Sequence, residues 1–173
     1  SLENIDLSGI REIGNNTFEG CTSLASVDLS SVNTIGNYAF KGCTALTEVY
    51  IPDSVVDMGT SVFLDCDNLQ SLTVSDGNSA YRLGSAGELL NYDGTQILYV
   101  PASATGEYVI EQGMTAGDYA FAGTGVDDMD LSDCVDLMPR VKNGTLTWQA
   151  DKDRVVAVQY VKYFYEGTHA VNN

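Results

Sequence analysis

Paired carboxylates are the residues of this chain whose type and spacing come closest to those of a catalytic site. Asp6 and Asp28 hold equivalent positions in two consecutive apolar stretches of similar sequence. If those stretches are neighbouring strands, the two carboxylates lie about 5 Å apart, which resembles the acid pair of a retaining glycosidase. An open sheet face, however, lacks the cleft that raises the pKa of one carboxyl group and excludes water. We therefore expect a solvated acidic face and no catalytic residue here.

Other groups for catalysis or metal binding are scarce. His169 is the only histidine and lies in a polar stretch at the end of the sequence, so we expect no Ser or Cys with a general base beside it. The sequence has no Cys-x-x-Cys pair or second histidine for zinc, and no glycine-rich phosphate loop. We predict a protein that is not an enzyme and has no cofactor.

A second acidic cluster could bind a cation. It consists of Asp127, Asp128, Asp130 and Asp133. Carboxylate oxygens are suitable ligands for calcium, but the cluster lacks the spacing of an EF-hand loop. Calcium is therefore an alternative and not the main expectation.

Tyrosines suggest a recognition surface. Tyr50 occupies an outward position of a predicted strand, and Tyr92 and Tyr99 flank a predicted turn. Exposed tyrosines beside polar residues suit the recognition of proteins or sugars, although half of an alternating strand points inward, so some tyrosines belong to the core. The candidate binding residues are Asp6, Asp28, Glu48, Tyr50, Thr73, Tyr92, Tyr99, Asp128 and Asp130.

A repeat of 22 or 23 residues must position these side chains. Its columns are Leu2, Leu24, Leu46 and Leu69; Phe18, Phe40 and Phe63; and Cys21, Cys43 and Cys66. A period of this length is typical of a solenoid, in which each repeat is one coil stacked on the previous coil. Leu-x-x-Val-x-Leu predicts a short strand of a parallel sheet, and an apolar-Gly step predicts a tight bend. The Phe is expected to enter the core from an irregular or helical turn.

The cysteine column predicts a ladder of small buried side chains. Strands of adjacent coils are about 4.7–4.9 Å apart, within the Cα range of a disulfide. A buried cysteine, however, behaves as a small hydrophobic residue. Free thiols are favoured, and a bridge between neighbours remains the alternative. Cys134 lies outside this column.

Charge and composition divide the chain. The net charge of the 173 residues is −16, which disfavours nucleic acid as a partner; no apolar run is long enough to span a bilayer. Residues 1–139 contain three basic and 21 acidic side chains, and residues 140–173 contain five and three. This break predicts a repeat region over 1–139, followed by a strand-rich C-terminal cap or the start of a following domain over 140–173.

The repeat is interrupted over residues 78–107. Asp93-Gly94 lies there between two apolar stretches, which predicts an inserted β-hairpin with a two-residue turn. The repeat pattern then resumes, with Ala116-Gly117 and Phe121 in the expected order. Because Leu2 already holds a repeat position, we expect the chain to be a piece of a larger protein.

Two segments carry a family resemblance. Ile35-Gly-Asn-Tyr-Ala-Phe-Lys-Gly-Cys-Thr-Ala-Leu and the stretch from Ile51 to Leu69 resemble the BspA-like leucine-rich repeat family. The resemblance implies a right-handed superhelix in a bacterial cell-surface or secreted protein, and adhesion to host proteins or to other cells. The 78–107 insertion and the 140–173 tail carry no family motif, so nothing transfers to them.

These observations favour a non-enzymatic, monomeric module that binds a protein partner through its sheet face and inserted hairpin. One alternative is a structural spacer that presents other domains of a larger surface protein. The other is a carbohydrate-binding accessory module in which acidic residues and tyrosines contact the sugar.

Overall fold

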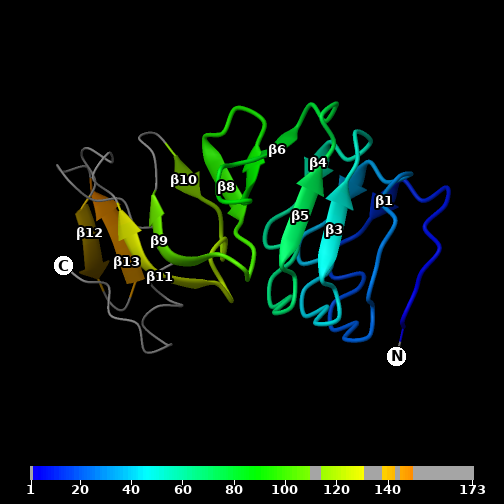
Figure 1. Cartoon of the computed structure of the whole chain (residues 1–173), viewed down its shortest axis with the longest axis horizontal. Coiled ribbons are helices and arrows are strands. Elements are labelled where there is room, and N and C mark those ends of the chain that lie inside the picture. Colours follow the sequence, from blue (N-terminus) through cyan, green and yellow to red (C-terminus); the bar gives the residue numbers. More distant parts are fainter. Residues whose placement is uncertain (1, 110–113, 131–137, 143–144, 150–173) are drawn as a thin grey trace.

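The computed structural model describes residues 2–109, 114–130, 138–142 and 145–149 (Figure 1). These residues contain strands and no helix, and so no helical segment that could cross a membrane. The strands are β1 (Glu12–Ile13), β2 (Thr34–Ile35), β3 (Glu48–Ile51), β4 (Asp57–Met58), β5 (Ser71–Val74), β6 (Tyr81–Leu83), β7 (Leu89–Asn91), β8 (Gln96–Tyr99), β9 (Thr105–Val109), β10 (Thr115–Ala116), β11 (Gly125–Asp130), β12 (Met138–Lys142) and β13 (Thr145–Gln149).

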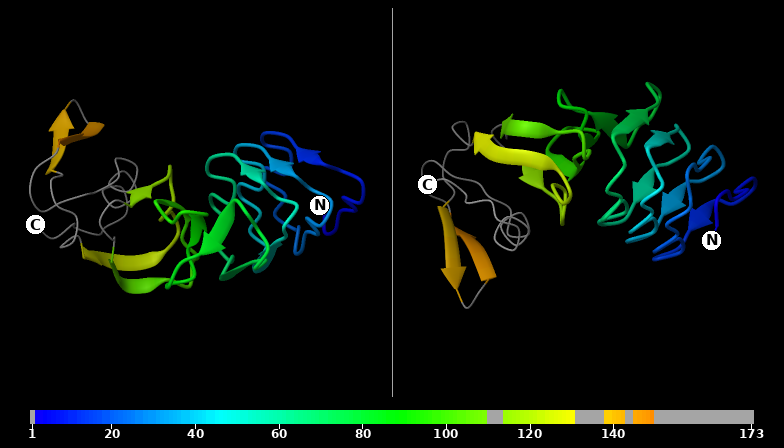
Figure 2. Two further views of the ribbon diagram at one scale, coloured as in Figure 1. Left: turned by 90° about the horizontal axis from the view of Figure 1, so that it is seen from above. Right: turned by 60° about the horizontal axis from the view of Figure 1, so that its bottom comes forward.

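Successive repeats stack in parallel, in register with the sequence period. β1, β2 and β4 form one parallel sheet in which Ile13 pairs with Ile35 and Ile35 pairs with Met58. Each pairing therefore joins equivalent residues of consecutive repeats, and Figure 2 shows the coils following one another from the N-terminal end. Stacking is required because a single coil has too little apolar surface to bury.

The predicted strand of the leucine-rich stretch is present in two repeats. β3 and β5 are parallel, and their pattern alternates, with Val49, Ile51 and Leu72 buried. The equivalent stretches around Leu7 and Leu29 bury their leucines, but they are not strands. The apolar pattern thus predicts burial in all four repeats and regular strand pairing in only two.

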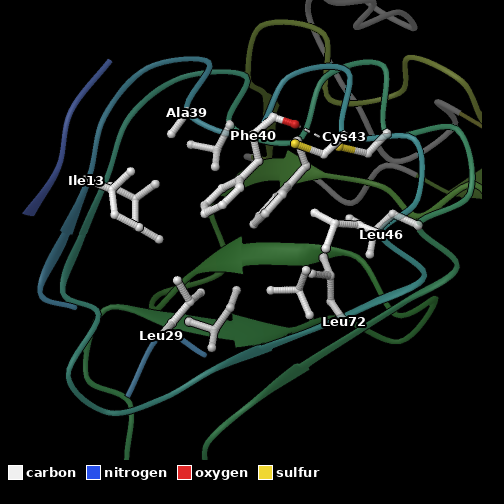
Figure 3. Close-up of a cluster of buried hydrophobic side chains, with 14 of the residues drawn as sticks. Ile13, Leu29, Ala39, Phe40, Cys43, Leu46 and Leu72 are labelled. Atoms are coloured by element: carbon white, nitrogen blue, oxygen red, sulfur yellow. Dashed lines mark hydrogen bonds between the residues drawn. The ribbon is translucent and has the colours of Figure 1, made fainter. Parts of the chain in front are cut away.

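A column of aromatic rings forms the centre of the core. The rings of Phe18 and Phe40 stack with centroids 5.2 Å apart, and those of Phe40 and Phe63 stack at 5.8 Å. Phe40 is fully buried among the leucines of the neighbouring coils (Figure 3). The turns that carry these rings are irregular and not helical.

The described cysteines are free thiols. The Sγ of Cys43 donates to the carbonyl oxygen of Phe18 at 3.2 Å, and the Sγ of Cys66 donates to that of Phe40 at 3.1 Å. Burial raises the pKa of Cys43 to about 11 and that of Cys66 to about 12. Both thiols are therefore neutral donors that connect one coil to the preceding one.

One backbone conformation recurs in the stretch from the apolar-Gly step to the Phe, which we call the Gly–Phe segment: residues 13–18, 35–40, 58–63 and 116–121. The fourth residue of each segment has φ between 53° and 59°, in the left-handed region: Asn16, Tyr38, Ser61 and Tyr119. The glycine permits close stacking, since a Cβ on Gly36 would lie 2.5 Å from the amide nitrogen of Asn15. The segment at 116–121 confirms that the repeat resumes after the interruption.

The interruption at 78–107 contains the predicted hairpin, with a different turn. β6, β7 and β8 are consecutive antiparallel strands, with a register irregularity between Leu89 and Leu90. Four residues, Tyr92–Thr95, connect β7 and β8, so the prediction of a two-residue turn is wrong. The turn starts earlier because the amide of Gly94 donates to the carbonyl oxygen of Asn91, and Asp93 Oδ1 accepts from the amide of Thr95.

β8 also belongs to the repeat stack. It pairs in parallel with β10, and the amide of Gly117 donates to the carbonyl oxygen of Ile97 at 2.7 Å. Between the first and second repeats, the amide of Gly36 donates in the same way to the carbonyl oxygen of Ile13. The second strand of the hairpin therefore takes the place of a repeat strand.

Beyond the interruption, β9 and β11 are parallel, with a bulge between Val126 and Asp128. β12 and β13 form an antiparallel pair in which Lys142 pairs with Thr145. Cys134, His169 and the proposed cap beyond residue 149 lie outside the described residues. The boundary predicted at 139/140 falls within β12 and remains a prediction.

Candidate recognition surface

The outward face of β3 and β5 brings together three of the predicted binding residues. Tyr50 pairs with Thr73, and Glu48 pairs with Ser71 in the same parallel ladder. All four side chains are exposed, and 54% of the Tyr50 surface is accessible. We call these four residues the sheet face. They form a polar surface with one large aromatic ring, held rigid by the buried residues on the other side of the strands.

The acidic pair shows no sign of a catalytic arrangement. Asp6 Oδ1 accepts from the amide of Ser8 at 2.9 Å, and Asp28 Oδ1 accepts from the amide of Ser30 at 2.9 Å. Hydrogen bonds from Ser8 and Ser30 lower the pKa of both exposed carboxyl groups. A general acid needs a raised pKa. These two carboxylates are ionised turn-forming groups on an open surface.

Tyr92 lies in the β7–β8 turn and is the most exposed tyrosine whose accessibility is described, at 61%. Its carbonyl oxygen accepts from Arg82 Nε at 3.0 Å. Asp93 beside it accepts from the hydroxyl and amide of Thr95, which lowers the pKa of Asp93. The turn therefore presents an aromatic ring beside a fixed negative charge.

Tyr99 is not a surface residue, so its selection as a binding candidate is wrong. It is 7% exposed, and its ring contacts the Phe63 ring edge-on at 5.8 Å. Its hydroxyl donates to the carbonyl oxygen of Leu69 at 3.5 Å, and burial raises its pKa. Because β8 has joined the repeat stack, Tyr99 continues the column of Phe rings. Tyr81 and Tyr108 are buried as well.

Asp128 and Asp130 are in β11, where their backbones pair with Glu107 and Val109. Among the residues that the structure describes, no group of three or more His, Cys, Asp or Glu could hold a metal ion. Asp133 lies outside those residues. The binding role of these aspartates and the calcium alternative therefore remain predictions.

Sequence reasoning missed a cavity. About 250 Å³ of space lies between the Gly–Phe segments 58–63 and 116–121, with β8 beside it. No pattern in the sequence marks it, because residues 97–100 are recognised as a shortened Gly–Phe segment only through the pairing of β8 with β10.

Parallel stacking of short coils with leucine, glycine, phenylalanine and cysteine columns defines a leucine-rich repeat protein. Residues 1–85 match the family described as BspA type leucine rich repeat region, in six copies. This region of the chain belongs to that family, which confirms the resemblance found in the sequence. No curated protein matches the chain.

Two solved structures share the fold. A leucine-rich repeat protein from Eubacterium ventriosum is 23% identical, with a TM-score of 0.50 over 74% of this chain and 47% of that chain. The pneumococcal vaccine antigen PcpA is 18% identical, with a TM-score of 0.51 over 72% of this chain and 40% of that chain. At these identities the likeness concerns the fold alone. The chain spans less than half the length of either protein.

Proposed function

We propose that this chain is a non-enzymatic protein-binding module that uses the sheet face and the exposed Tyr92 turn. The observation that carries the proposal is Tyr50, a large ring held exposed on a rigid strand between polar neighbours. Tyrosine contributes much contact area at low entropic cost and is enriched at the centres of interfaces. The leucine-rich repeat class supports this proposal.

The setting that we propose is the surface of a bacterium, or secretion from it, with a host or other-cell protein as partner and adhesion as the role. The family match supports the setting, and one structural neighbour is described as a vaccine antigen. We also propose that the stacked coils form a right-handed solenoid, that residues 140–173 close its C-terminal end, and that the module is monomeric.

The proposal can be tested by pull-down from extracellular-matrix proteins with the double variant Tyr50→Ala/Tyr92→Ala. We expect the variant to lose a saturable partner while its unfolding midpoint stays unchanged, since both rings are exposed. Val56→Ala is the matched control, because Val56 is an exposed apolar residue outside the sheet face and the turn. A partner retained by the double variant would contradict this site. No partner for the folded native chain would favour the spacer, and binding to a glycan array instead would favour the carbohydrate module.

A further inference from the structure

The cavity described above is walled by backbone as well as by side chains. Thr60, Ser61 and Phe63 line one side, and Gly117 and Asp118 line the other. Leu98 and Tyr99 of β8 also line it. The cavity is thus where a complete coil would otherwise fill the stack.

A shortened coil explains the cavity. The carbonyl oxygen of Ile97 accepts a hydrogen bond from the amide of Gly117. In the first repeat the carbonyl oxygen of Ile13 accepts from the amide of Gly36 in the same way, so Ile97 holds the first position of a Gly–Phe segment. The amide of Val100 donates to the carbonyl oxygen of Ala120. The amide of Phe18 donates to the carbonyl oxygen of Ala39 in the same way, so Val100 holds the Phe position. Residues 97–100 therefore span with four residues what the complete segments span with six, and the two missing residues leave the space open.

The shortened coil leaves a row of amides without acceptors. In the first repeat the amides of Asn16, Phe18 and Gly20 donate to carbonyl oxygens of the next repeat, and Tyr38, Phe40 and Gly42 do the same in the second. The equivalent amides of the third repeat are those of Ser61, Phe63 and Asp65. Within the described part of the chain they have no acceptor. The Ser61 hydroxyl instead donates across the cavity to the carbonyl oxygen of Asp118 at 3.0 Å.

We infer that this edge binds an extended peptide segment of a partner protein, which supplies the missing carbonyl oxygens. Three donors at alternate residues of this irregular edge match carbonyl groups at alternate residues of a peptide that lies along it, and such backbone pairing is how partner segments add to a sheet edge. The peptide lies along Phe63 and Asp65 and displaces the Ser61–Asp118 bond to reach the amide of Ser61. The site is separate from the sheet face and does not depend on it.

The surroundings define the peptide. The half-buried Leu98 provides apolar surface for one aliphatic side chain in the middle of the segment, next to the buried rings of Phe63 and Tyr99 that also line the cavity. Asp118 lines the cavity and is exposed, the exposed Asp65 follows the lining residue Leu64 in the chain, and the chain as a whole is strongly acidic. Basic flanking residues are therefore attracted and acidic ones are repelled. The fitting ligand is an extended, basic peptide with an aliphatic centre.

Amide hydrogen exchange tests the premise and the binding together. In the free protein, the amides of Ser61, Phe63 and Asp65 should exchange faster than those of Tyr38, Phe40 and Gly42. Millimolar amounts of a blocked peptide of sequence KTVTK should slow exchange at the first three and shift their NMR signals. The peptide ETVTE should have no effect. Equal exchange rates for the third-repeat and second-repeat amides would overturn the inference. So would exchange rates and NMR signals of the third-repeat amides that KTVTK leaves unchanged.

A variant that fills the cavity supplies the control for location. Gln96 is exposed on β8 and lines the cavity, so Gln96→Trp should weaken KTVTK binding by at least about tenfold. Ser85→Trp, at an exposed position that does not line the cavity, should leave binding unchanged. Circular dichroism confirms that both variants fold. Equal affinity of the two variants for KTVTK would overturn the peptide assignment. The sugar maltotriose is a second probe, and NMR shifts at these amides with maltotriose but not with KTVTK would overturn the assignment as well.

Discussion

At the scale of single residues, left-handed backbone positions mark each repeat. Beyond the fourth residue of each Gly–Phe segment, a second such position follows the Phe by two residues. Gly20, Gly42 and Gly123 occupy it with φ between 70° and 76°, whereas the third repeat has Asp65 with φ 58°. The left-handed conformation is strained for a residue with a Cβ and nearly free of strain for glycine.

Replacing this aspartate should stabilise the protein. Asp65→Gly is expected to raise the free energy of unfolding by about 0.5–1 kcal/mol, because the relief of strain exceeds the added entropy of the unfolded chain. Urea denaturation measures the change, and Gly42→Asp should shift the midpoint in the opposite direction. A lower midpoint for Asp65→Gly would show that the aspartate side chain itself stabilises the turn.

Buried thiol and tyrosine hydroxyl groups should make the protein less stable at alkaline pH. Burial raises the pKa of Cys43 from 9.0 to about 11, that of Cys66 from 9.0 to about 12, and that of Tyr81 from 10.0 to about 12. The folded state then holds protons that the unfolded state has lost, so stability is complete below about pH 9 and falls as the pH rises toward 12. Urea midpoints measured under reducing conditions should decline over this range. The decline should be shallower in Cys66→Ala, and constant midpoints up to pH 11 would contradict these pKa shifts.

At the scale of elements, Asn78 joins the stacked repeats to the β6–β8 strands. Its side-chain nitrogen donates to the carbonyl oxygens of Pro52 at 2.7 Å and Val55 at 2.9 Å. Its side-chain oxygen accepts from the amides of Ala80 and Tyr81, both at 2.8 Å. Asn78 is 3% exposed, and its bonds with Val55 and Tyr81 are buried while those with Pro52 and Ala80 are partly buried. A buried side chain that donates two hydrogen bonds and accepts two others fixes the point where the chain leaves the repeat.

The variant Asn78→Asp should be strongly destabilised at neutral pH. It replaces the donor with a carboxylate oxygen that faces two carbonyl oxygens, and we expect a loss of about 3 kcal/mol. Urea denaturation provides the measurement. Asn68→Asp is the matched control, because Asn68 donates to the carbonyl oxygen of Thr44 from an exposed position, where the loss should stay below about 1 kcal/mol. Equal losses in the two variants would contradict the role of buried hydrogen bonds at Asn78.

At the scale of the whole molecule, stability comes from a continuous apolar core inside a highly acidic surface. The described core runs from Leu7 through the Phe column to Tyr99. Around it, residues 1–139 carry 21 acidic and three basic side chains. Among the described residues only Lys41 and Glu19 form an ion pair, at 3.1 Å. Most surface charges therefore repel one another without local compensation.

Salt should stabilise such a molecule. Ions at about 0.15 M screen charges that are farther apart than about 8 Å, so sodium chloride should raise the melting temperature as repulsion among the carboxylates weakens. Thermal unfolding at low and moderate salt measures the effect, and an equal osmolality of glycerol controls for solvent exclusion. A melting temperature that falls with added salt would show that attractive pairs dominate the surface.

The sequence by itself determined the repeat, its register and the burial of the Phe column, because these depend on apolar residues that recur at a constant interval. It also placed Tyr50, Glu48 and Thr73 on one face, since side chains alternate along a strand. Only the tertiary structure decided that β8 replaces a repeat strand, which buries Tyr99. That outcome depends on pairing between β8 and β10, which are far enough apart in sequence that no local pattern records it. The cavity and its row of free amides follow from the same pairing, because the shortened coil leaves space only when complete coils stack on both sides of it.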